Sequence, residues 1–174
     1  MPYKDDLLFV EAVTQVLLDE GGSKITDDPE DPGGRTKYGI TQKLLTAIGG
    51  GPVDDLTEEE AKSIYYDHFW LEYHIEEIPA PDLAVKVFNF CVTAGPRAAF
   101  LCLQRAMRAN GVTLTEDGVM GPITRGKLRH LLNDPQPDCR AYGMYIAYKS
   151  EIAGYYRDLD KPHFESGWVN RAYR

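Results

Sequence analysis

The stretch LLDEGGSKITDDPEDPGGRTKYGIT, residues 17–41, joins the end of an apolar helical segment to a long polar loop. Apolar side chains recur at helical spacing up to this point and form one face of the expected helix: Phe9, Val13, Val16 and Leu17. Glu20 falls on the same face, and Gly21-Gly22 then supplies a natural helix end. The pattern therefore places a carboxyl group at the tip of a buried helix face.

The segment after this helix, residues 23–40, lacks helical periodicity and holds prolines and glycines that favour loops. Its last part leads into RTKYGIT at 35–41, which favours a short strand, and we expect a small hairpin there. Thr41 suits the cap position of a short helix that follows.

Helical periodicity dominates the rest of the chain. Residues 83–92 are apolar except for Asn89, as is typical of a central helix. Gly-Pro pairs at 95–96 and 121–122 start two more helices, and a tyrosine-rich helix follows at 139–159. The expected fold is mainly α, with a small β-hairpin after the first long helix.

Length and charge narrow the class of protein. The 174 residues suffice for a real core in one domain or two small ones. A net charge of −8 argues against nucleic acid as a partner, because phosphate binding needs a basic face. No stretch reaches the roughly 18 apolar residues of a membrane span, and MPYKDDLLFVEAV does not resemble a signal peptide. We expect a globular protein that is synthesised in the cytoplasm and does not span a membrane.

The carboxyl group at the helix tip suggests proton chemistry. At the edge of an apolar face the charged form of Glu20 is disfavoured, so its pKa is expected to rise. A carboxylic acid that stays protonated can donate to a leaving oxygen, and glycosidic bond cleavage pairs such an acid with an ionised second carboxylate. The polar loop offers four candidates for that second group: Asp27, Asp28, Glu30 and Asp31.

Other interpretations of the same residues remain open. A lone glutamate near a helix end is most often a solvated surface residue, and DPEDPGG at 28–34 favours a turn without any catalytic role. A calcium-binding loop of the EF-hand type is excluded, because no glutamate stands at the twelfth position and prolines interrupt the loop.

The complete stretch resembles glycoside hydrolase family 108, whose members carry Glu-Gly-Gly, a short spacer and Asp-Pro-Gly-Gly-x-Thr-x-x-Gly-Ile-Thr. The positions in register are Glu20, Gly21, Gly22, Asp31, Pro32, Gly33, Gly34, Thr36, Tyr38, Gly39, Ile40 and Thr41. Segments at 64–70, 87–99 and 167–171 also resemble the family, so the resemblance spans nearly the full chain. The family implies a lysozyme-like fold with the acid at the end of the first long helix and a hairpin opposite.

Such proteins are N-acetylmuramidases, peptidoglycan hydrolases that cut the β-1,4 bond between N-acetylmuramic acid and N-acetylglucosamine. They occur as bacteriolytic phage endolysins and as secretion-associated proteins. The resemblance implies that Glu20 is the general acid and that Asp31, with Thr36 or Thr41, holds the attacking water. Tyr38 and Gly39 are expected to contact substrate.

Asn89 is either a satisfied core amide or a further sugar contact. No second histidine stands at metal-ligand spacing from His68, and we expect neither metal nor cofactor.

The second half resembles a peptidoglycan-binding region through LQRAMRANG at 103–111 and DGVMGPIT at 117–124. The same residues also suit a plain turn and a capped helix. We therefore expect a muramidase region at 1–94 and a helical binding-like region at 95–174, packed into one compact unit. Basic residues gather in this half, which predicts a local positive face despite the acidic total.

Two alternatives differ in function. A lytic transglycosylase would use the same acid without water, and a non-catalytic wall-binding or secretion-assisting protein would keep only the fold. In either biological setting the expected partner is the glycan strand of the periplasmic wall, reached through a holin or another release system.

Overall fold

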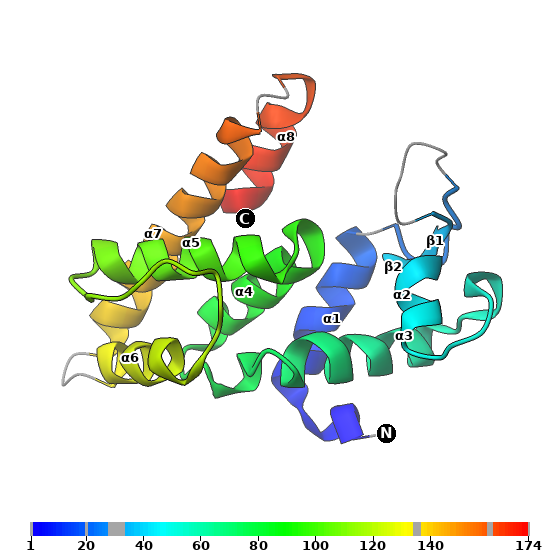
Figure 1. The fold of residues 1–174 in the computed structure, drawn as a ribbon, viewed down its shortest axis with the longest axis horizontal. Helices are drawn as coiled ribbons and strands as arrows, with labels where there is room; N and C mark the ends of the chain where they lie inside the picture. Colours follow the sequence, from blue (N-terminus) through cyan, green and yellow to red (C-terminus); the bar gives the residue numbers. More distant parts are fainter. Residues whose placement is uncertain (1, 20, 28–33, 134–136, 160–161, 174) are drawn as a thin grey trace. The chain divides into compact units, whose positions relative to one another are not determined.

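The structure, a computed structural model, describes residues 2–19, 21–27, 34–133, 137–159 and 162–173 (Figure 1). Most of these residues are helical, and a single short hairpin is the only sheet that they form. The prediction of a mainly α, lysozyme-like fold with a small hairpin after the first long helix is confirmed. No helix in the described part of the chain combines the length and the apolar character that crossing a bilayer requires.

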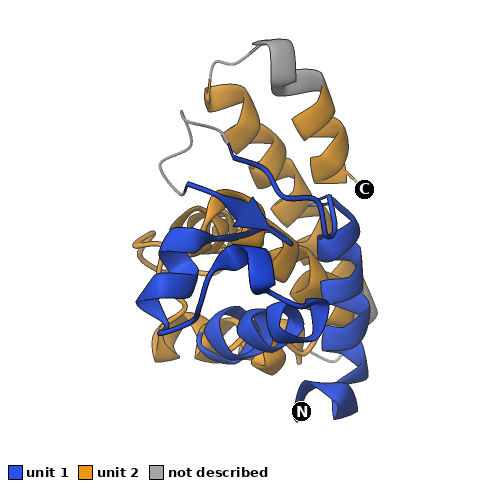
Figure 2. Cartoon of the chain, turned by 90° about the vertical axis from the view of Figure 1, so that its right-hand side faces the viewer, with its two compact units in different colours: residues 1–72 blue, residues 73–174 orange. Residues whose placement is uncertain are grey.

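The chain divides into two compact units, residues 1–72 and residues 73–174 (Figure 2). The elements of unit 1 are η1 (Pro2–Asp5), α1 (Leu7–Asp19), β1 (Thr36–Lys37), β2 (Ile40–Thr41), α2 (Gln42–Ala47), η2 (Val53–Asp55), α3 (Glu58–Tyr65) and the π-helical η3 (Tyr66–Leu71). Those of unit 2 are η4 (Ile75–Glu77), α4 (Pro81–Ala94), α5 (Pro96–Ala109), α6 (Pro122–Leu132), α7 (Pro137–Asp158) and α8 (Pro162–Tyr173). From the sequence, a muramidase region is expected at 1–94 and a binding-like region at 95–174. That division by function stays a prediction.

Unit 1 is built on the predicted apolar face of α1, whose buried side chains are Phe9, Ala12, Val13, Val16 and Leu17. The Phe9 ring meets the ring of Tyr66 edge-on, with centroids 4.9 Å apart, and that of Trp70 at 5.6 Å. Asp6 accepts the Phe9 amide at 3.0 Å, as a helix cap does, and also the Trp70 indole N–H at 2.9 Å. One carboxylate therefore caps α1 and joins it to the segment after α3.

In unit 2, α4 buries six side chains, in keeping with its nearly continuous apolar sequence: Leu83, Ala84, Val87, Phe88, Phe90 and Cys91. The Phe90 ring lies 5.4 Å from that of Tyr155 and 5.6 Å from that of Tyr156. Tyr156 in turn stacks on Trp168 of α8 at 5.5 Å. Most of the tyrosine series of α7 thus serves packing, whereas Tyr142 is 68% exposed.

The 103–124 segment is organised around a buried amide. The Gln104 side chain is fully buried in α5, where it donates to Asp117 Oδ1 at 2.7 Å and accepts the Gly118 amide at 2.8 Å. It also reaches the Thr124 hydroxyl at 3.2 Å, at the start of α6. Gly118 has φ +71°, and a methyl group there would lie 2.9 Å from the Arg97 carbonyl oxygen. The Leu-Gln and Asp-Gly-x-x-Gly-Pro-x-Thr residues therefore have a structural role in joining two helices.

Two glycines of this region give a matched test of that role. We expect Gly118→Ala to lower the free energy of unfolding by about 2–4 kcal/mol, because it adds left-handed strain to a backbone clash. Gly126 lies within α6 with open space around it, so Gly126→Ala should raise stability by about 0.5–1 kcal/mol. Urea unfolding of both variants measures the difference, and equal effects would contradict the structural role of Gly118.

Candidate active site

The candidate site begins where α1 ends. Gly21 has φ +84°, and its amide lies 3.4 Å from the Leu18 carbonyl oxygen, while the Gly22 amide lies 2.9 Å from that of Leu17. These are the two hydrogen bonds of a Schellman motif, which explains why the sequence places two glycines at this point. Glu20, the predicted acid, lies outside the described residues.

The hairpin beside this helix end has a strained turn. Lys37 pairs with Ile40, so the connection consists of Tyr38 and Gly39 alone. Their φ angles are +55° and +76°, the combination that a type I′ turn requires. A tyrosine in the left-handed region is uncommon and costs about 1–2 kcal/mol. Such strain persists only where the surroundings impose it, and it is concentrated at functional sites.

Hydrogen bonds to its amide and to its carbonyl hold the backbone of Tyr38 in place. Its amide donates to the Gly22 carbonyl oxygen at 3.2 Å, and its own carbonyl accepts the Tyr65 hydroxyl at 2.9 Å. Tyr65 belongs to α3 and is only 1% exposed, so it is itself held by packing. The Lys37 ammonium lies 5.7 Å from the centroid of the Tyr38 ring. The predicted substrate-binding turn, Tyr38 with Gly39, is therefore tied to the residues that follow α1.

The two predicted threonines have different local bonds. Thr36 donates its hydroxyl proton to the Gly34 carbonyl at 3.0 Å, and its backbone pairs with Thr26 on the far side. The Thr41 hydroxyl accepts the Leu44 amide at 3.2 Å and caps α2, as the sequence predicts. A hydroxyl has one donor and two acceptor positions, so the bond to Gly34 leaves the acceptor positions of Thr36 for a water.

One of the four candidate carboxylates is already paired. Asp27 Oδ2 lies 3.1 Å from Arg35 Nη1, and Asp54 Oδ1 lies 2.6 Å from Arg35 Nη2. The hydrogen bond and charge of Asp54, with a smaller contribution from Asp27, raise the pKa of Arg35 above its ordinary value. The guanidinium thus joins the loop before the hairpin to η2. The other three candidates, Asp28, Glu30 and Asp31, lie outside the described residues.

Asn89, the remaining predicted site residue, lies in α4 of unit 2. It is half-buried, and its carbonyl accepts the Thr93 hydroxyl at 2.8 Å. Its neighbours around a small cavity include Lys86 and Tyr156. Its role as a sugar contact stays a prediction.

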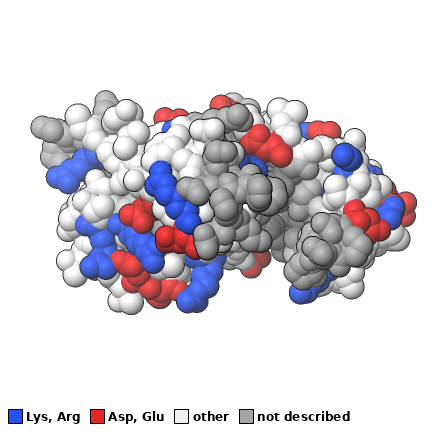
Figure 3. Space-filling view, turned by 90° about the horizontal axis from the view of Figure 1, so that it is seen from above, with Lys and Arg blue, Asp and Glu red and all other residues white. Residues whose placement is uncertain are grey.

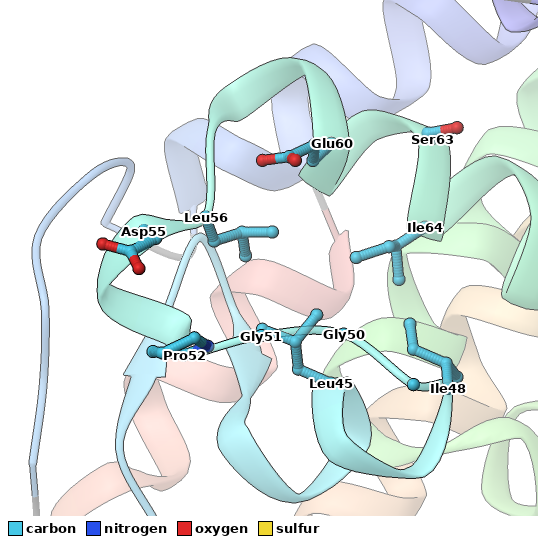
Figure 4. A pocket seen from close by; sticks show the side chains of 11 residues that line it. Leu45, Ile48, Gly50, Gly51, Pro52, Asp55, Leu56, Glu60, Ser63 and Ile64 are labelled. Atoms are coloured by element: carbon cyan, nitrogen blue, oxygen red, sulfur yellow. The ribbon is translucent and has the colours of Figure 1, made fainter.

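Unit 1 also contains a pocket of about 400 Å³ between the glycine loop after α2 and helix α3. Leu56 and Ile64 face each other across it, as Figure 4 shows. Its carboxylates include Glu60, whose pKa is lowered by hydrogen bonds from Thr57 in a capping box. None of the predicted site residues that the structure describes lines this pocket, and a lowered pKa disfavours Glu60 as a proton donor.

A further group of titratable side chains lies in unit 2, where ligand atoms of His74, Glu76 and Glu77 lie within 4.8 Å of one another. Glu77, however, pairs with Arg125 Nη1 at 2.7 Å and with Arg129 Nη2 at 2.9 Å. Two guanidinium groups on one carboxylate compete with a metal cation, so we describe this cluster as an ion-pair network.

The contacts of Tyr65 and Arg35 were missed by the sequence analysis. Tyr65 is one of the buried residues of α3, and nothing in a helical pattern tells which buried tyrosine directs its hydroxyl to a distant carbonyl. Arg35 follows Gly34 in an irregular segment, and its partner Asp54 is 19 residues away.

Comparisons with known proteins show what the chain is similar to in sequence and in fold. Residues 13–95 match the model of the family described as glycosyl hydrolase 108, a range that holds the end of α1, the loop, the hairpin and α4. A solved structure, that of Brucella abortus SagA, is similar to the chain with 27% identity and a TM-score of 0.73. The likeness covers 95% of this chain and 90% of SagA. No curated protein matches the chain significantly. The candidate site thus lies within a segment that is similar to a glycosyl hydrolase family, and nearly the whole chain shares the fold of SagA.

Proposed function

We propose that the protein is a peptidoglycan hydrolase, an N-acetylmuramidase that cleaves the bond between N-acetylmuramic acid and N-acetylglucosamine. The observation that carries this proposal is the glycosyl hydrolase 108 match over residues 13–95, which include Glu20, Asp31 and the hairpin. The strained turn held beside the end of α1 supports it, because a fixed backbone beside the acid would position a sugar ring.

In the proposed reaction, Glu20 donates its proton to the glycosidic oxygen as the bond to the anomeric carbon breaks. A water attacks that carbon from the opposite face and gives its proton to Asp31, which acts as general base. Thr36 accepts a hydrogen bond from the second proton of this water, since its own proton is engaged by Gly34. Exchange with solvent then returns the proton to Glu20 and removes one from Asp31. This arrangement inverts the anomeric configuration.

The Tyr38–Gly39 turn orients the sugar in this proposal. Glycine lets the glycan approach the backbone closely, and the bonds to Gly22 and Tyr65 keep the turn from moving when the substrate binds. The turn is therefore already ordered before the substrate binds, so less conformational entropy is lost on binding.

Removal of the acid is the first test. We expect Glu20→Gln to lower the rate of sacculus digestion by about 10²–10⁴-fold, because the amide cannot protonate the leaving oxygen. The control is Glu11→Gln, an exposed carboxylate on the same helix, which should keep wild-type activity. Mass analysis of the digest distinguishes the chemistry, since hydrolysis yields reducing muramic ends. Anhydro-muramic ends would instead identify a lytic transglycosylase, and undigested sacculi with the wild-type protein would favour a wall-binding protein.

The base can be tested within a single loop. We expect Asp31→Asn to lower kcat by about 100-fold, whereas Asp27→Asn should change kcat little, since Asp27 is an exposed partner of Arg35. Initial rates on purified sacculi measure both variants. An equal loss of kcat in the Asp31→Asn and Asp27→Asn proteins would mean that the negative charge of the loop matters, and not a general base at Asp31.

The hydrogen bond from α3 provides a third test. Tyr65→Phe removes only the hydroxyl that holds the Tyr38 carbonyl, and we expect about a tenfold loss of kcat with a loss of about 1 kcal/mol in stability. The control Tyr142→Phe removes a hydroxyl from an exposed ring and should alter neither quantity. Unchanged kcat in a destabilised Tyr65→Phe protein would show that the turn has a purely structural role.

A further inference from the structure

Four of the arginines in the second half, where a positive face is expected, are paired with carboxylates. Glu116 receives both Arg105, at 3.3 Å, and Arg108, which makes a shorter contact. The Glu77 network engages two more, Arg125 and Arg129. On the face shown in Figure 3, Lys and Arg atoms likewise lie next to Asp and Glu atoms. A broad basic surface is therefore not what these residues form.

A concave site in unit 2 is lined by basic side chains that the ion pairs above do not include. It lies between the turn after α5 and the facing parts of α6 and α7, and its volume is about 420 Å³. Three basic side chains line it, Lys127, His130 and Arg140, and all three are exposed to solvent. None of the described residues that line it is acidic. In a chain of net charge −8, this makes the pocket a local concentration of positive charge.

The turn that forms one wall is hydrogen-bonded to the end of α5. The amides of Gly111 and Val112 donate to the last carbonyls of α5 at 2.9 and 3.0 Å, and the Asn110 side chain donates to the Ala106 carbonyl at 2.9 Å. These bonds satisfy carbonyl groups that would otherwise present the negative end of the helix dipole to the pocket. Leu131, which is 8% exposed, adds an apolar side chain to the lining.

One of the hydrogen-bond donors of the pocket, the Lys127 ammonium, is held in position by the protein before any ligand binds. The Lys127 ammonium donates to the Thr113 carbonyl, which holds it beside the pocket. An ammonium has three N–H donors and a guanidinium has five in a planar fork, so both groups can bond a ligand in addition to their protein partners. Such a set matches a carboxylate or a phosphate, which accept charge-assisted hydrogen bonds through several oxygens.

We propose that the pocket formed by residues 110–113, Lys127, His130, Leu131 and Arg140 binds an anionic group of the cell-wall polymer. The source of the ligand rests on the proposed function, since stem peptides of peptidoglycan carry carboxylates and attached wall polymers carry phosphodiesters. The pocket adds affinity for the wall through unit 2, separately from the groups that cleave the glycan. It allows an acidic protein to bind an anionic polymer at one point while the rest of its surface is repelled.

The test compares two double variants with the same net charge. Lys127→Gln with Arg140→Gln removes two cations of the pocket, and Lys43→Gln with Arg157→Gln removes two exposed cations elsewhere. All proteins carry Glu20→Gln, so that sacculi stay intact during cosedimentation. We expect the pocket variant to bind sacculi about tenfold more weakly and the control variant to bind like the parent. Equal binding by both variants, or an equal loss, would overturn the proposal.

Treatment of the sacculi separates the two sources of the anion. Amidation of the stem carboxylates should remove the difference between the variants if carboxylates are bound, and hydrofluoric acid extraction of phosphodiesters should remove it if phosphates are bound. A difference that survives both treatments would overturn the proposal.

A direct measurement is independent of hydrolysis and of the wall. Titration of the full-length protein with acetate and with inorganic phosphate should shift the amide resonances of Gly111, Val112 and Lys127, and the pocket variant should lose these shifts. Shifts spread over the whole surface, or none, would reject the site even if the protein digests peptidoglycan. Localised shifts in a protein without hydrolase activity would reject only the proposed function.

Discussion

The geometry of the candidate site depends on the backbone of one residue, Tyr38. Its amide is bonded to the Gly22 carbonyl and its carbonyl to the Tyr65 hydroxyl, so the turn cannot relax from its left-handed conformation without losing both bonds. The net value of two such bonds, about 1 kcal/mol each, is comparable to the strain that they maintain. The end of α1, the hairpin and α3 are thereby held in one arrangement.

In unit 2 the side chains that resemble a wall-binding motif and those suited to binding an anion are different. Gln104 and Gly118 form a buried joint between α5 and α6, and a ligand cannot reach a side chain that is fully buried. The basic residues of the concave site, by contrast, are exposed and belong to no recognisable pattern. The motif in the sequence therefore indicates residues that hold the fold together, Gln104 and Gly118. The basic concave site is formed only when α5, α6 and α7 pack against one another.

The elements near the site could be predicted because their signals are local. Apolar spacing gave the buried face of α1, paired glycines gave its end, and Thr41 was identified as a cap from its position before a short helix. Each of these depends on residues within one or two turns of one another. The roles of Glu20 and Asp31 came from resemblance rather than from such physics, and both lie outside the described residues.

The sequence by itself determined the helical class, the hairpin, and a segment that matches a glycosyl hydrolase family, because periodicity, turn residues and motifs are properties of neighbouring positions. Only the tertiary structure decided which groups meet: Tyr65 with Tyr38, Arg35 with Asp54, and Glu77 with two arginines 48 and 52 residues away. It also decided which basic side chains line the concave site of unit 2: Lys127, His130 and Arg140. Long-range partners are selected by the packing of whole elements, and no local pattern encodes that choice.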